Sequence, residues 1–241
     1  KEGKGAGYAR NIGLSHARGK WIIFADADDF FTADCFTILN EYMASPHEVI
    51  YFNVRFVMSD NPSQESRRGT YYTNFFNDVN PENKLRYQSQ VPWGKMIRRS
   101  FLSTFHIQFD ETRIANEVYF SCLVGIYAPK ATTDRRIIYY CTESGQALAM
   151  SKQDRESLII RFNASMKCNR LLRQEKIHYY LSPLPWCIPS AKTKEWLPAK
   201  YFFEYLFFFR LQAFKELYYA FSAILSHMNE PATKETDNQC N

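Results

Sequence analysis

Three aspartates stand close together in the sequence FADADDF, directly after a short apolar run. Asp26, Asp28 and Asp29 repel one another, and each carboxylate needs water, a hydrogen-bond donor or a cation. Mg²⁺ and Mn²⁺ take hard oxygen ligands and keep coordination sites open for phosphate oxygens. The pattern therefore predicts that Asp26 and Asp28 hold a divalent cation that bridges to a diphosphate. The alternative is that Asp28 and Asp29 cap the helix that follows.

The elements around these aspartates predict where they lie. Residues 5–18 have the apolar spacing of a helix, and Gly19 stands where a helix stops. The apolar run KWIIFA over 20–25 is typical of a buried parallel strand, whose carboxyl end is where α/β sheets bind ligands. The segments predicted to follow are a helix over 32–43, a strand over 48–57, a polar loop over 59–70, a strand over 93–99, a helix over 116–126 and a strand over 135–141.

The last third of the chain has a helical pattern. Ser151 and Asp154 form a capping-box-like start to a long helix with an apolar stripe, and prolines then separate it from a second helix over 200–225. Because aromatic side chains surround that second helix, it either packs on the first domain or lies on an anionic membrane surface. The predicted organisation is a mixed α/β domain over 1–150, a helical extension over 151–227 and a disordered tail over 228–241.

Composition excludes several classes of protein. The 241 residues carry a net charge of +5, which is a smaller and less clustered excess than proteins that bind nucleic acid usually have. The six cysteines form no CxxC pair, so we expect neither a zinc site nor a disulfide framework, and a reduced cytoplasmic setting fits best. Aromatic residues reach 17%, enough to stack on flat ligands such as sugars in addition to filling a core.

Three motifs occur in a characteristic order. The segment GYARNIGLSHARGKWIIFADADDFF resembles the signature of family 2 glycosyltransferases, and VPWGKMIRRSFL resembles their W-x-K segment. Asn116 and Glu117, which precede an aromatic residue, occupy the place of the family's acidic pair. The resemblance spans about residues 5–145 and implies a GT-A-type, Rossmann-like mixed α/β sheet with a C-terminal helical extension. The family's first strand, which reads like VSVIIPVYN, and the acidic loop that follows it, which reads like VDDGS, are not found. The resemblance therefore predicts an N-terminally incomplete domain.

The resemblance also implies roles for single residues. It makes Glu117 the catalytic base and assigns binding of the metal, Mn²⁺ or Mg²⁺, to Asp26 and Asp28. It assigns donor binding to Arg10, Asn11, Asp26, Ala27 and Asp28, and acceptor binding to Trp93, Lys95 and Asn116. The residues alone leave other roles open: Arg10 as an ordinary exposed helix arginine, Trp93 as a core residue, and Glu117 as an exposed first-turn glutamate.

Together these expectations predict a transferase of polysaccharide biosynthesis. It would move a hexosyl or N-acetylhexosaminyl group from a nucleotide-sugar donor to a glycan or lipid-linked acceptor, with inversion and with metal dependence. We expect it in the cytoplasm, with peripheral contact at the inner face of the membrane through the C-terminal helices. Two other classes stay open, a metal-dependent nucleotidyltransferase that also uses paired aspartates and a non-catalytic glycan-binding protein.

Overall fold

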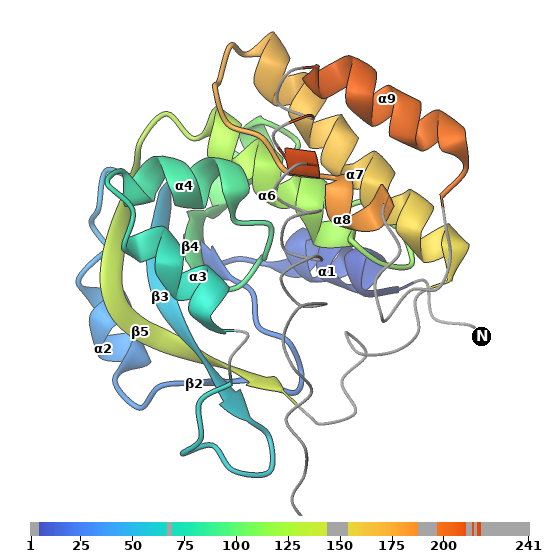
Figure 1. The fold of residues 1–241 in the computed structure, drawn as a ribbon. Coiled ribbons are helices and arrows are strands. Elements are labelled where there is room, and N and C mark those ends of the chain that lie inside the picture. The colour runs from blue at the N-terminus through green and yellow to red at the C-terminus, as the bar shows by residue number, and fades with distance from the viewer. Residues whose placement is uncertain are drawn as a thin grey trace, which may run out of the picture. The chain divides into compact units, whose positions relative to one another are not determined.

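A five-stranded mixed sheet surrounded by helices forms the fold in a computed structural model, which describes residues 5–66, 69–143, 154–187, 197–210, 214, 216 and 217 (Figure 1). The chain divides into two compact units, Lys1–Trp196 and Leu197–Asn241. The first unit contains α1 (Gly5–His16), β1 (Trp21–Ile23), β2 (Phe30–Phe31), α2 (Cys35–Asn40), β3 (Val49–Met58), α3 (Gly69–Phe76), α4 (Pro81–Gln88), β4 (Lys95–Arg98), α5 (Arg99–Thr104), α6 (Asn116–Tyr127), β5 (Ala131–Glu143), α7 (Arg155–Gln174) and α8 (Leu184–Cys187).

The strand order is β1-β4-β3-β5-β2. The central pair, β3 and β5, is parallel, and every other pair is antiparallel. The first four residues of β3, VIYF, are all buried, as expected for β-branched and aromatic residues in a strand covered on both faces. β1 differs from the parallel strand predicted over 20–25, because it pairs antiparallel with β4 at one edge of the sheet and buries only Ile22.

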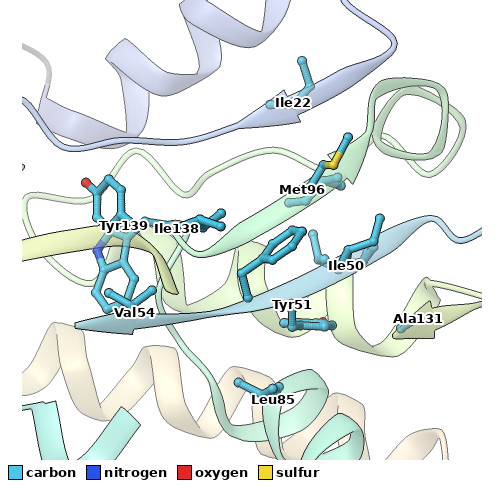
Figure 2. Close-up of a cluster of buried hydrophobic side chains, with 14 of the residues drawn as sticks. Ile22, Ile50, Tyr51, Val54, Leu85, Met96, Ala131, Ile138 and Tyr139 are labelled. Atoms are coloured by element: carbon cyan, nitrogen blue, oxygen red, sulfur yellow. The ribbon is translucent and has the colours of Figure 1, made fainter. Parts of the chain in front are cut away.

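The core combines side chains of β1, β3, β4 and β5 with side chains of the helices α2 to α6, and Figure 2 shows part of it. Ile22, Met96 and Ile50 follow one another across β1, β4 and β3, and Tyr139 of β5 lies beyond them. Leu85 of α4 is completely buried against this cluster. The core therefore holds β5, and with it Tyr139, in a fixed place relative to β1 and the aspartates that follow β1.

Helices extend the fold away from the sheet. α3 and α4 lie together over the sheet, and α6, α7 and α8 follow beside them (Figure 1). α4 and α6 approach closely at Gly125, where an added Cβ would lie 1.7 Å from the carbonyl oxygen of Arg86. Apolar side chains of α6 and α7, among them Val118, Cys122, Ala164 and Cys168, form a second buried cluster.

Two predicted helices begin later than the sequence indicated. The helix expected over 32–43 is confined to α2, because Phe30 and Phe31 pair with β5 and the N–H of Thr32 continues that pairing by donating to the Ile138 carbonyl. α7 begins at Arg155, and the Asp154 carboxylate caps it by accepting from the Ser157 N–H at 2.8 Å. Ser151 lies outside the described residues.

α7 packs on α6, and both helices belong to the first unit. The polar loop predicted over 59–70 is present up to Ser66, and α3 begins at Gly69. The predicted disordered tail over 228–241 lies outside the described residues.

The second unit contains α9 (Ala199–Phe209). The sequence predicted one helix over 200–225, but α9 ends at Phe209 because Arg210 has φ 47°, in the left-handed region that an α-helix cannot use. Phe203 and Phe207 are exposed on its surface. None of the helices in the described part of the chain combines the length and apolar character that a membrane crossing requires.

Candidate functional site

Arg10 connects two of the predicted site residues. Its guanidinium donates to the Asp26 carboxylate at 2.6 Å and to the Asn116 side-chain oxygen at 2.8 Å. Both members of the ion pair are partly buried, with side-chain exposures of 18% for Arg10 and 34% for Asp26. A shielded pair is weakened less by water and salt than a surface pair. Helix α1, the loop after β1 and the start of α6 therefore meet at Arg10.

Two features of α1 place Arg10 there. Gly7 lets the helix approach the 110–116 segment, since an added Cβ would lie 2.1 Å from the Asp110 carbonyl oxygen. The Asn11 side chain pairs with the backbone of Phe109, donating to its carbonyl at 3.0 Å and accepting from its N–H at 2.8 Å. The Asn11 amide thus makes a structural contact, whereas the sequence analysis predicted that it binds the donor.

The third aspartate has a structural role. The Asp29 carboxylate accepts from the Tyr139 hydroxyl at 2.6 Å and from the Thr142 N–H at 2.7 Å. The same Tyr139 oxygen accepts from the Asp26 N–H at 2.8 Å. Burial raises the pKa of Asp29, and the hydrogen bonds from Tyr139 and Thr142 oppose that rise. The aspartate loop is therefore anchored to β5 at both Asp26 and Asp29.

Ala27 and Asp28 lie at the exposed turn of this loop. The Thr142 hydroxyl donates to the Asp28 backbone carbonyl at 2.8 Å, which fixes the backbone, while no described residue donates to the Asp28 carboxylate. Within the described ranges, no group of three or more His, Cys, Asp or Glu side chains is placed to hold a metal ion. Mg²⁺ at phosphate sites is often held by one or two carboxylates together with the substrate phosphates, and Asp28 with Asp26 beside it fits that smaller donor set.

Glu117 lies in the first turn of α6, next to Asn116. Burial raises the pKa of its carboxyl, and the positive charges of Arg10 and Arg161 oppose the rise. Asp26 is close enough to raise it as well. The predicted donor residues Arg10 and Asp26 and the predicted base therefore share one electrostatic environment.

Arg161 and Tyr139 were not among the residues chosen from the sequence. Arg161 is on α7, its guanidinium lies 5.1 Å from the centre of the Trp186 ring, and its buried Nε has no hydrogen-bond partner among the described residues. Its only sequence signal is a charge inside the apolar run LIIRF. Tyr139 stands in a predicted strand, and no motif marks it.

The structure places Trp93 and Lys95, the predicted acceptor residues of the W-x-K segment, in the core. Trp93 is 6% exposed, and its ring packs on the rings of Phe56, Tyr72 and Tyr139. This is the core position that the sequence analysis gave as the alternative to acceptor binding. Lys95 is fully buried, donates to the Ser89 carbonyl at 3.2 Å, and has its pKa lowered to about 7 by burial. Asn116, the third predicted acceptor residue, is 4% exposed and bound to Arg10. The geometry thus favours structural roles for all three.

A comparison with known families matches residues 1–105 to the family described as Glycosyl transferase family 2. This segment belongs to that family. The family 2 segment contains Arg10, Asn11 and the aspartate loop, and it ends after the W-x-K segment. The family that the sequence motifs indicated is therefore confirmed. No curated protein matches the chain in a sequence search.

Solved structures similar to the chain include S. aureus TarS 1-349 in complex with UDP-GlcNAc, at a TM-score of 0.53 and 17% identity, with 76% of this chain and 50% of that chain covered. TarS 1-349 in complex with UDP matches at a TM-score of 0.50 and 17% identity, with 76% and 48% covered. The chain thus spans about half the length of these TarS chains. The similarity confirms the predicted fold class, a GT-A-type mixed α/β sheet.

Proposed function

We propose that the chain is part of a glycosyltransferase that takes its sugar from a nucleotide-sugar donor and transfers it with inversion to a glycan or lipid-linked acceptor. The observation that carries this proposal is that Arg10 binds both Asp26 and Asn116 next to Glu117. In addition, the first 105 residues of the chain match family 2. The complexes of TarS with UDP-GlcNAc and UDP support a uridine diphosphate sugar as the donor.

Donor binding is assigned to the aspartate loop and Arg10. Asp28 presents an exposed carboxylate at the carboxyl end of β1, where ligands bind in α/β sheets. Bound Mn²⁺ or Mg²⁺ would supply a Lewis acid that offsets the charge developing on the nucleoside diphosphate. Arg10 adds a positive charge on the same side of the site, and the anchoring of the loop to Tyr139 holds the carboxylates in place before the donor arrives.

Glu117 is assigned the role of general base. Inversion by a single displacement needs one base, which takes the proton from the acceptor hydroxyl as its oxygen attacks the anomeric carbon. Burial raises the pKa of Glu117, and a base works best when its pKa lies near the working pH. Because Asn116 is neutral, the carboxyl has no acidic neighbour immediately before it in the chain.

The binding of nucleotide in the presence of Mn²⁺ tests the donor site. In the full-length protein, UDP binding should increase with added Mn²⁺, and Asp28→Ala should abolish that increase because Asp28 supplies the free carboxylate. Asp60→Ala, a change at an exposed aspartate on a different loop, is the matched control and should bind as the unchanged protein does.

Two results would contradict the proposal. Metal-dependent binding that survives Asp28→Ala would leave Asp28 without a role in the donor site. Release of pyrophosphate instead of a nucleoside mono- or diphosphate during turnover would identify a nucleotidyltransferase.

A further inference from the structure

A pocket of about 550 Å³ lies between α3, α4 and the segment that contains α8, all within the first unit. Its volume falls in the range of about 300–1,000 Å³ that small-molecule sites occupy. Its lining includes Tyr71, Asn74, Asp78, Lys84, Gln90 and Trp186. We propose that this pocket is a saccharide subsite that holds one neutral sugar unit of the acceptor, an inference that rests on the proposed function.

Aromatic rings on the pocket wall provide flat apolar surfaces. Tyr71 is 63% exposed, and its ring packs edge to face on the ring of the buried Phe75, with 4.9 Å between the ring centres. Trp186 presents a second, half-buried ring. A pyranose has apolar C–H faces that pack on such rings and hydroxyls around its edge, so it matches a lining that contains both aromatic and polar groups.

The polar groups of the pocket select for a neutral ligand. Asn74 and Gln90 offer side-chain amides, which both donate and accept hydrogen bonds, as sugar hydroxyls do. Asp78 and Lys84, two charged residues of the lining, form an ion pair at 3.7 Å, so their charges largely cancel. A phosphate or a carboxylate would gain little from such a lining, whereas a hydroxyl-rich ring gains hydrogen bonds.

The pocket is connected to the predicted base through two side chains. Trp186 lines the pocket, and the Arg161 guanidinium lies 5.1 Å from the centre of the Trp186 ring. The charge of Arg161 in turn acts on the Glu117 carboxyl. A sugar held against Trp186 would therefore lie next to a ring whose neighbour, Arg161, carries a charge that acts on Glu117.

Saturation-transfer NMR with neutral oligosaccharides tests the subsite without donor or metal. The probes are maltotetraose, cellotetraose and tetra-N-acetylchitotetraose, each added to the full chain. We expect saturation transfer to at least one probe and a loss of affinity of about three- to tenfold in Tyr71→Ala. Phe36→Ala removes another exposed aromatic ring, on α2 and outside the pocket lining, and should leave binding unchanged.

Absence of saturation transfer from all three probes would overturn the subsite, as would equal binding by Tyr71→Ala and the Phe36→Ala control. If Tyr71→Ala does not fold, Asn74→Ala at an exposed position of the same pocket serves instead. Metal-dependent UDP binding is measured on the same samples. UDP binding without saccharide binding would contradict the subsite but not the proposed function. Saccharide binding without metal-dependent UDP binding would contradict the proposed function.

Discussion

Arg10 holds partners that are 16 and 106 residues away in the sequence, Asp26 and Asn116. The sequence motifs predicted that Arg10 and Asp26 both belong to the donor site, and the structure brings them together. Asn116 was expected to bind the acceptor, yet its side-chain oxygen is used by Arg10. A motif can mark which residues matter, but side-chain pairing over such distances depends on the tertiary fold.

Replacement of the Glu117 carboxylate should remove catalysis without removing donor binding. Glu117→Gln retains the size of the side chain but cannot accept a proton, so sugar transfer should fall by ~10²–10⁴-fold while UDP binding stays unchanged. The measurement is initial transfer rate in the full-length protein. Glu156→Gln, which alters a first-turn glutamate of α7, is the control. Near-normal transfer by Glu117→Gln would show that Glu117 is not the base.

The charge of Arg161 should control the pH at which the base works. Transfer should decline as pH falls through the raised pKa of Glu117, because only the carboxylate accepts a proton. Arg161 lowers that pKa, so Arg161→Met should raise it further and shift the acid limb of the pH–rate profile to higher pH. The exposed Arg170 is on the same helix, and Arg170→Met should leave the profile in place. An unshifted profile in Arg161→Met would mean that the Arg161 charge does not reach Glu117.

At the level of elements, helices and strands with strong local signals were predicted well. The predicted α1, β3 and α6 agree with the structure within a few residues, because each has a clear apolar period or a continuous apolar run. β1 was assigned to a buried parallel pair, since three apolar residues cannot reveal which strand lies beside them. Trp93 and Lys95 stand in a family motif, but only their packing shows that they are buried.

Two glycines of α1 should respond in opposite ways to alanine. Gly7→Ala should lower the free energy of unfolding by ~1–3 kcal/mol, because the new Cβ would overlap the Asp110 carbonyl oxygen. Gly13→Ala should raise it by ~0.5–1 kcal/mol, because no atom outside the neighbouring helix backbone lies within 4 Å of the added Cβ and alanine favours the helix. Urea denaturation measures both changes. Equal effects of the two substitutions would show that α1 does not pack on the 110–116 segment.

Across the whole molecule, the described cysteines form no disulfide and differ in burial. Cys35, Cys122, Cys168 and Cys187 are buried, and Cys141 is partly exposed. Burial raises the pKa of Cys35 to about 11, which disfavours its reactive thiolate. A maleimide reagent should therefore modify Cys141 first among these five in the folded protein, and the other four only after denaturation.

Peptide mass spectrometry measures which cysteines are modified, and the denatured protein provides the reference for complete labelling. Labelling of Cys35 as fast as Cys141 would contradict the packing of α2 on the sheet.

The edge position of β1 has a consequence for association. In the part of the chain that the structure describes, β1 pairs with β4 on one side, and its sequence is the apolar Trp21, Ile22 and Ile23. Natural edge strands are usually protected by charge, proline, bulges or a covering segment, because an unpaired strand edge is a template for pairing with another chain. Wherever β1 is left uncovered, self-association should therefore begin at this edge, by strand addition.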